Sequence, residues 1–96
     1  MVETAQSAAR PNADLAEVIR QRLQALSPVA LEIQDDSHLH AGHAASEGGA
    51  SHFTVRITSS CFVGLGPVAR HRLVYDRLDD LMPFPLHALA LETRTP

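Results

Sequence analysis

The chain has 96 residues, 45% of them hydrophobic, and a formal net charge of −3, which together fit one small globular domain rather than a disordered chain or a strongly basic nucleic-acid module. Every basic residue is an arginine, and the single cysteine, Cys61, excludes both an internal disulfide and a CxxC metal site. No apolar run reaches the ~20 residues of a membrane span, and no signal peptide is recognisable, so we expect a cytoplasmic protein with no membrane partner.

The N-terminal part of the chain is predicted to hold a tail followed by one helix. Residues 1–12 are small and polar without periodicity, so we expect a flexible tail, with the folded domain covering residues 13–96. Apolar residues spaced by three and four predict an amphipathic helix from Asp14 to Leu26, because this spacing places them on one face. Ser27-Pro28 ends the helix, since a residue before proline disfavours helical backbone.

Two strands separated by a long loop are predicted next. Polar and apolar residues alternate from Val29 to Asp35 and again from His52 to Ser59, which is typical of half-buried strands. Residues 37–51 between them are rich in Gly, Ala, Ser and His, and a loop this long within a small domain is usually functional or mobile. We expect the two strands to pair antiparallel around this loop.

A second helix and a third strand complete the predicted fold. Val68 to Met82 reads as a helix that Pro67 can begin, and Leu86 to Glu92 reads as a short strand. The order α-β-β-α-β predicts an α+β sandwich of the KH-like kind, with a three-stranded mixed sheet, the second and third strands parallel, and both helices on one face. The apolar stripe of the second helix is predicted to hold His71, Val74, Tyr75, Leu78, Leu81 and Met82.

Histidines mark one end of this predicted sheet. His52 and His87 each begin a strand, and parallel strands begin at the same end, with neighbours ~5 Å apart. Two imidazoles can therefore converge on one metal there, and neutral imidazole is a common metal ligand. Cys61 lies past the other end of the second strand, ~25 Å away at ~3.3 Å per residue, so we expect a small apolar filler rather than a co-ligand.

The loop before the second strand holds three more histidines, His38, His40 and His43. They could simply be a solvated polar tract, or one of them could replace His52 as a ligand. His52 itself could point to solvent, and His87 could be satisfied by a backbone carbonyl. These alternatives stay open on the residues alone.

The second helix carries a separate group of arginines. Arg70, Arg72 and Arg77 could form a solvated face paired with nearby aspartates, or could contact phosphates or a protein partner. His71 lies on the apolar stripe and is expected to be structural. The aspartates available for such pairing are Asp76, Asp79 and Asp80.

Two further positions are expected to be structural. Asp36 stands at the end of the first strand, where a turn with side-chain-to-backbone hydrogen bonds is more typical than acid–base catalysis. Gly64 begins a loose GxxG pattern, but Pro67 removes a donor that a nucleotide-clamping loop would use. No nucleophile–base pair or phosphate loop is visible, so we expect neither an enzyme nor a small-molecule substrate.

The order and spacing of several motifs resemble the BolA family, over roughly residues 14–96. The first is D-D-S-H-L-H-A-G-H at residues 35–43, followed by S-H-F at 51–53. Phe62-x-Gly64, R-H-R-L-V-Y at 70–75, H-A-L at 87–89 and a closing Thr95-Pro96 complete the set. Any one of these motifs alone would be weak, and their agreement in order makes the resemblance specific.

The resemblance implies a class II KH-like fold and a partnership with a monothiol glutaredoxin. In such heterodimers a [2Fe–2S] cluster is shared, and the partner supplies a cysteine and a bound glutathione thiol. On this chain the resemblance implies His87 as one ligand and His52 as the best match for the second, with His40 and His43 as alternatives. We expect no cluster in the isolated protein. Bacterial relatives are also described as transcriptional regulators of stress response, morphology and biofilm formation, which makes DNA binding by the second helix the competing expectation.

Overall fold

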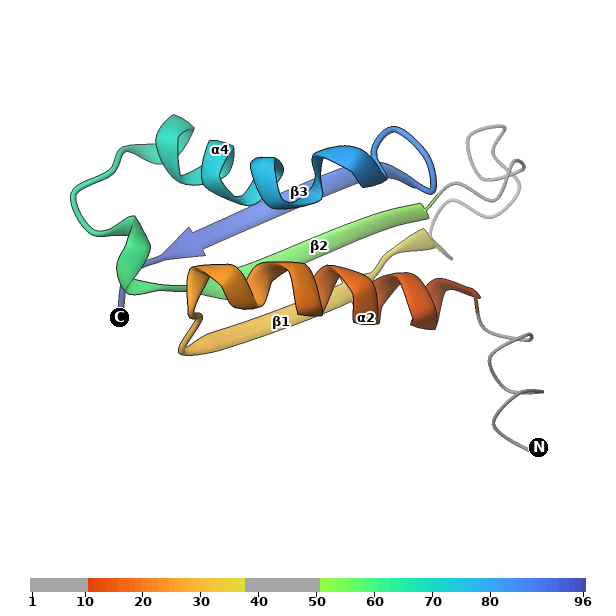
Figure 1. Cartoon of the computed structure of the whole chain (residues 1–96), viewed down its shortest axis with the longest axis horizontal. Coiled ribbons are helices and arrows are strands. Elements are labelled where there is room, and N and C mark those ends of the chain that lie inside the picture. Colours follow the sequence, from red (N-terminus) through yellow and green to blue (C-terminus); the bar gives the residue numbers. More distant parts are fainter. Residues whose placement is uncertain (1–10, 38–50) are drawn as a thin grey trace.

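The computed structural model describes residues 11–37 and 51–96. Two helices and three strands follow one another in the predicted order, helix–strand–strand–helix–strand (Figure 1). The elements are α2 (Pro11–Leu23), the 3₁₀ turn η1 (Gln24–Leu26), β1 (Ala30–Asp35), β2 (Ser51–Thr58), η3 (Ser60–Phe62), α4 (Pro67–Leu78), η4 (Asp79–Leu81) and β3 (Leu86–Arg94).

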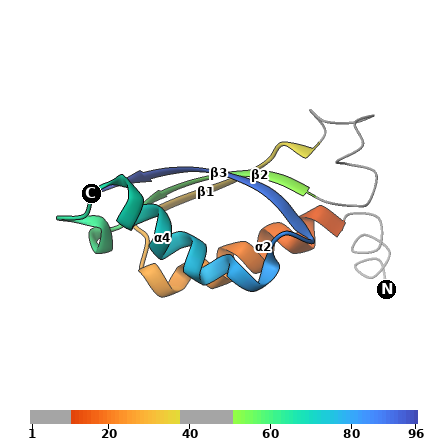
Figure 2. The same ribbon diagram turned by 90° about the horizontal axis from the view of Figure 1, so that it is seen from above.

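The three strands form one mixed sheet with β2 at its centre. β1 pairs with β2 antiparallel and β3 pairs with β2 parallel. Both helices pack on the same face of this sheet, and the other face is open (Figure 2). The predicted two-layer α+β sandwich is therefore confirmed, and the parallel pair places the first residues of β2 and β3 at one end.

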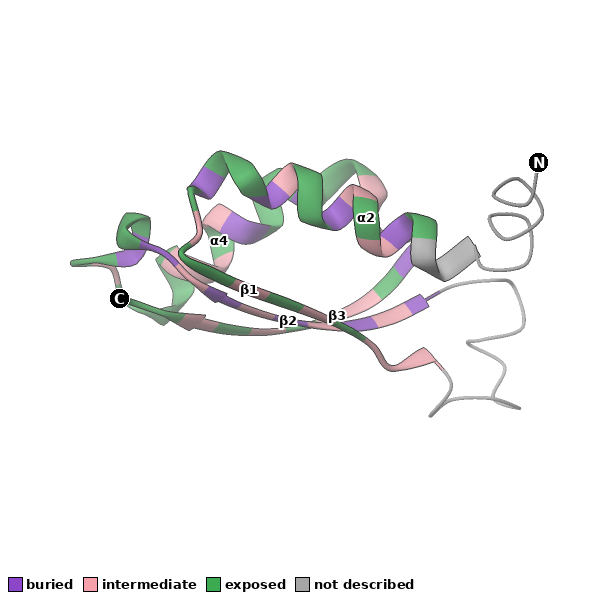
Figure 3. Ribbon diagram, turned by 90° about the horizontal axis from the view of Figure 1, so that it is seen from below, coloured by how far each residue is buried: buried purple, intermediate pink, exposed green. Residues whose placement is uncertain are grey.

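Alternation along β2 divides the molecule into a core side and an open side (Figure 3). Ser51, Phe53, Val55 and Ile57 are buried, and the residues between them are only half-buried, because successive side chains of a strand point to opposite faces. The helices cover the buried face. The core consists of Leu15, Ile19, Leu23, Leu26, Phe53, Val55, Ile57, Phe62, Val74, Leu78 and Leu86.

The helix bounds differ from the prediction in ways that proline and turn geometry explain. α2 begins at Pro11 rather than Asp14. The N–H groups of a first helical turn have no partner within the helix, so proline, which lacks an N–H, is tolerated there. The last residues predicted for each helix form the 3₁₀ turns η1 and η4 instead, which is a common way for a helix to end. Within the described ranges, no helix has the length and apolar character needed to cross a bilayer.

The stripe of α4 is narrower than predicted. Val74 and Leu78 are buried, but His71 is half-buried and Tyr75 is 37% exposed, with its hydroxyl donating to the Leu89 carbonyl at 3.2 Å. Tyr75 thus lies on the predicted stripe without joining the buried core, and its polar tip reaches the backbone of β3.

An ion pair joins the last turn of α2 to the 3₁₀ turn η4 that follows α4. Arg22 of α2 contacts both carboxylate oxygens of Asp80, with Nη2 to Oδ2 at 2.9 Å, and its Nη1 also donates to the Arg77 carbonyl at 3.2 Å. The hydrogen bond from Arg22 lowers the pKa of the Asp80 carboxyl. The carboxylate of Asp80 therefore pairs with an arginine of α2 rather than with an arginine of its own helix.

Candidate functional site

The start of β3 is irregular at the position of His87. Ser51 of β2 pairs with Leu86 and the next residue, His52, pairs with Ala88, so β3 has one extra residue at this step. That extra residue is His87. Leu86 is fully buried, whereas His87 is exposed.

This bulge decides where the His87 side chain goes. In a regular strand His87 would face the same side as Leu89, which packs against the core. The extra residue lets Leu86 and Leu89 both face the helices, so the side chain of His87 need not point to the core face. Bulges near functional sites commonly redirect a side chain in this way.

His52 is fixed by the backbone contacts at the start of β2. Its N–H donates to the Ser37 hydroxyl oxygen at 3.0 Å, and its carbonyl accepts from the Asp36 N–H at 2.8 Å. The ring is half-buried and its Nε2 is shielded from solvent. Alternation places His52 on the open face, since Ser51 and Phe53 on either side are buried.

The two imidazoles meet at this rim of the sheet. The ring centroids of His52 and His87 lie 5.3 Å apart, with the ring planes tilted by 56°. Two ligand nitrogens on one tetrahedral metal with bonds of about 2.1 Å lie roughly 3.4 Å apart, a spacing that rings at this separation can approach. The parallel strand starts thus bring the two rings close together, as expected, and we call His52 and His87 the histidine pair.

The histidine pair can supply only part of a metal coordination sphere. Over residues 11–37 and 51–96 there is no group of three or more His, Cys, Asp or Glu side chains arranged to hold a metal ion. Asp36, although close to His52 in the structure, is engaged in other contacts: its carboxylate accepts from the Thr54 hydroxyl and from Gln34 Nε2, the latter at 2.7 Å. Within the described residues, a metal at this rim would therefore have no more than two such ligands.

A pocket of about 230 Å³ opens beside the histidine pair. His52 forms one wall. Sequence reasoning missed this pocket, although the signal was present: Thr54, Ala88 and Ala90 occupy the same strand face as His52 in the alternating pattern. The lining residues are Asp36, His52, Phe53, Ala88, Leu89 and Ala90.

The other predicted site residues do not join the pair. His38, His40 and His43 lie outside the described residues. His71 is half-buried on α4. Cys61 follows the far end of β2 and is exposed, with its thiol 3.5 Å from the Leu26 carbonyl, so the expectation of an apolar filler is wrong. The 3₁₀ turn that contains Cys61 directs the side chain outward while Phe62, the next residue, fills the core.

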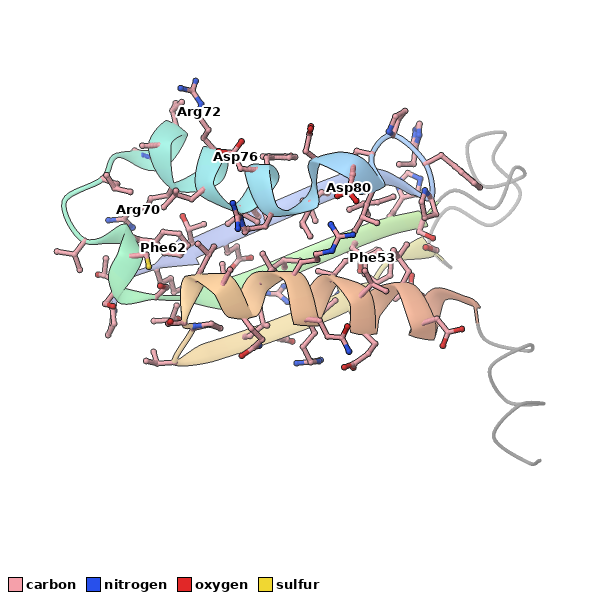
Figure 4. All side chains as sticks on the ribbon, viewed as in Figure 1. Phe53, Phe62, Arg70, Arg72, Asp76 and Asp80 are labelled. Carbon is pink, nitrogen blue, oxygen red and sulfur yellow. The ribbon has the colours of Figure 1, made fainter. Side chains whose placement is uncertain are left out.

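Arg70 and Arg72 of α4 lie apart from each other (Figure 4). Arg70 is half-buried and its Nε donates to the Leu65 carbonyl at 2.8 Å, which ties the first turn of the helix to the loop before it. Arg72 is exposed and extends away from the body of the molecule. Arg77 is exposed, and its backbone carbonyl accepts a hydrogen bond from Arg22, which also pairs with Asp80.

Gly64 has a conformational role in the same loop. Its φ of +81° lies in the left-handed region that glycine adopts without steric cost. A Cβ at this position would meet nothing within 4 Å, so backbone conformation alone requires glycine there.

Comparisons with known proteins cover most of the described chain. The sequence model of the family described as "BolA-like protein" matches residues 23–96. SufE-like protein 1 of Arabidopsis thaliana is 48% identical over 84 residues, which cover 81% of this chain but 23% of that protein. BolA-like protein 1 of Mus musculus is 46% identical over 79 residues, covering 81% of this chain and 56% of that protein. This chain thus spans about half the length, or less, of these two relatives.

A bacterial relative and a solved structure extend the comparison. The DNA-binding transcriptional regulator BolA of Escherichia coli is 40% identical over 83 residues, covering 81% of this chain and 76% of that protein. The solved BolA domain of SufE1 from Arabidopsis thaliana superposes with a TM-score of 0.74 at 45% identity, covering 84% of this chain and 91% of that domain. Fold and sequence therefore agree across the same region.

Proposed function

This chain belongs to the BolA family, and from that premise we propose that it is a non-catalytic adaptor that shares a [2Fe–2S] cluster with a monothiol glutaredoxin. His87 is the first ligand from this chain, and His52 is the second. His40 and His43 are the alternatives for the second position. The role is assembly or trafficking of iron–sulfur clusters.

The observation that carries this proposal is the 5.3 Å separation of the two imidazole rings at one end of the sheet. The donor set fits a shared cluster. Two imidazoles can occupy one iron, as in Rieske centres, and the other iron needs two thiolates. Cys61 stands at the opposite end of β2 and cannot reach this rim. Both thiolates must therefore come from the partner, as the cysteine of a glutaredoxin and the thiol of glutathione.

The residues around the pair hold the imidazoles for this task. His87 is exposed in the bulge, where a partner can reach it, and Ser37 and Asp36 fix the backbone of His52. A bound cluster with imidazole ligands would supply one-electron chemistry at a higher potential than an all-thiolate cluster. Because a ligating imidazole must be deprotonated, acidification weakens its hold on iron.

The test is reconstitution with the monothiol glutaredoxin of the same cell, glutathione, iron and sulfide. We expect a heterodimer whose visible spectrum differs from that of the glutaredoxin alone. His87→Ala should abolish that difference, and His71→Ala, a change of the same kind on α4, should preserve it. A heterodimer spectrum that His87→Ala leaves unchanged would refute the ligand assignment.

DNA binding is the second candidate, and the name of the Escherichia coli relative favours it. Arg72 and Arg77 are exposed on α4 and could contact phosphates. Such binding would weaken steeply with salt, because each neutralised phosphate releases counterions. A gel-shift series with promoter DNA at rising salt tests it, and no shift at about 0.15 M salt, near physiological strength, would exclude this role.

A further inference from the structure

The loop between α4 and β3 exposes an aromatic side chain at the end of the sheet that holds the histidine pair. Phe84 is 60% exposed, and it comes shortly before His87 in the chain. The backbone from one to the other spans at most about 11 Å even when fully extended. Figure 1 shows this loop beside the start of β2. Phe84 and His87 therefore belong to the same part of the surface.

Phe84 differs in position from the other large apolar side chains that the described residues expose. Val29, Val63 and Val68 are between 64% and 71% exposed, but they lie at the opposite end of the sheet, where β1 begins and where β2 leads into α4. Tyr75 lies on α4 and donates its hydroxyl to the backbone of β3. Exposed apolar side chains scattered singly are common, but Phe84 adjoins a candidate binding site.

Phe84 also belongs to an apolar run. Met82, Pro83, Phe84 and Pro85 are consecutive, and Pro83 and Phe84 are exposed while the other two are half-buried. An apolar run at a surface without a function is disfavoured, because it promotes non-specific association. This run therefore indicates a surface that is used for binding.

The loop holds Phe84 in place before any partner arrives. Its first residue, Met82, donates its N–H to the Asp79 carbonyl at 3.2 Å, and the carbonyl of Pro85 accepts from the Ser51 N–H at 3.0 Å. Proline on both sides of Phe84 restricts the loop further, since the proline ring fixes φ. Because the loop is already ordered, a partner loses little affinity in immobilising it.

The size of a protein interface identifies which molecule covers Phe84. A stable interface covers about 800 Å² on each partner, which corresponds to a patch roughly 30 Å across. Such a patch centred on His87 extends roughly 15 Å from it, beyond the largest backbone separation of Phe84 from His87. A protein that brings thiolates to the histidine pair therefore covers Phe84 as well.

We infer that Phe84 is the apolar anchor for the protein that supplies the thiolates at the histidine pair. That partner presents an apolar pocket next to its thiolates, and the ring of Phe84 fills the pocket when His87 binds the iron. Aromatic side chains dominate interface energetics, because each removes a large apolar area from water. The inference rests on the proposed function, since it assigns a recognition contact to the same partner, and this contact is separate from metal ligation.

Truncation of the ring is the direct test. The dissociation constant for the monothiol glutaredoxin is measured with glutathione, iron and sulfide present. We expect Phe84→Ala to weaken binding by about tenfold or more, as loss of an aromatic anchor does. Phe84→Leu keeps an apolar side chain and should weaken binding less. Val68→Ala removes apolar surface from another exposed position, at the opposite end of the sheet, and should leave binding unchanged.

A fluorine label reads out the same contact in the wild-type chain, where truncation cannot affect folding. The chain has three phenylalanines, and Phe53 and Phe62 are at most 2% exposed. In protein labelled throughout with 4-fluorophenylalanine, the fluorine signal that Phe84→Leu removes belongs to Phe84. In the isolated chain this signal should shift when H₂O is replaced by D₂O, because the ring is in contact with solvent. We expect the heterodimer to lose this solvent response.

The outcomes separate this inference from the proposed function. A wild-type chain that forms no cluster-bearing heterodimer refutes the proposed function, and this inference with it. A normal heterodimer spectrum refutes the anchor alone if Phe84→Ala binds as tightly as the wild type, or if the Phe84 signal still responds to the solvent. Loss of the solvent response as the concentration of the isolated chain rises would show that a second copy covers Phe84, and would overturn the assignment as well.

Discussion

The histidine pair and the arginines of α4 differ in how distance along the sequence relates to distance in space. His52 and His87 are far apart in the sequence, yet their rings lie 5.3 Å apart. Arg70, Arg72 and Arg77 belong to one helix, yet each does something different. Arg70 donates to the Leu65 carbonyl and Arg72 extends into solvent. The backbone carbonyl of Arg77 accepts a hydrogen bond from Arg22 of α2.

The difference shows what brings side chains together. Parallel pairing of β2 and β3 sets two strand starts next to each other, and a bulge at His87 aims one of the rings. On a helix each residue turns by about 100°, so Arg70 and Arg72, two residues apart, point to different sides. Proximity in the chain therefore did not bring the side chains together on α4, whereas sheet pairing did so at the rim.

The sharpest way to break this comparison is to remove the second histidine. His52→Ala should lower cluster retention by the heterodimer by at least about tenfold, since even indirect support of a metal ligand is worth roughly 10–100-fold. Visible absorption during dilution or chelator challenge measures it. If His40→Ala or His43→Ala causes the loss and His52→Ala does not, the second ligand lies in the loop and the sheet pairing positions only His87.

The next largest effect, a loss of stability, is expected in the loop before α4, which Arg70 ties to the helix. Gly64→Ala should destabilise the fold by about 1–2 kcal/mol, the cost of a left-handed backbone for a residue with a Cβ. Urea unfolding measures it. Gly66→Ala is the matched control, since its φ of −76° suits any residue. Equal losses for the two variants would contradict a conformational role for Gly64.

Arg70→Ala should have a moderate effect, of about 1 kcal/mol, because it leaves the Leu65 carbonyl without this donor. Arg72→Ala should change the free energy of unfolding by less than about 0.5 kcal/mol, as is usual for an exposed position. Thermal or urea unfolding compares the two. A larger effect for Arg72→Ala would mean that this side chain has a structural contact.

The smallest effect concerns pH and the Arg22–Asp80 pair. Because the folded-state pKa of Asp80 is lowered, the pair contributes stability above the ordinary carboxyl pKa of 3.8, and this contribution is lost as pH falls through the lowered value. Asp80→Asn should thus be less stable than the wild type at neutral pH, by a small amount since the pair is exposed, and equal to it in strong acid. Asp79→Asn is the control. A stability difference for Asp80→Asn that persists in strong acid would contradict the electrostatic origin.

Hydrophobic periodicity predicted most of the fold, because amphipathic helices and half-buried strands leave a direct record in the residues. The spacing along residues 14–26 and the alternation along residues 52–59 both gave the correct element type. The ends of the elements were predicted less well. The first helix starts at Pro11 rather than Asp14, and the third strand continues to Arg94 rather than Glu92. Helix ends depend on turn geometry, and strand ends depend on whether a neighbouring strand still offers partners, as Ser59 does by donating to the Arg94 carbonyl.

The sequence by itself determined the order of elements, the family and the residue type of the candidate ligands, since each follows from local pattern or from motifs in series. The tertiary structure alone decided the bulge at His87, the pocket over Ala88 and Ala90, and the pairing of Asp80 with Arg22. These features arise where two distant segments meet, and their geometry depends on register and packing between segments. A local pattern carries no record of either.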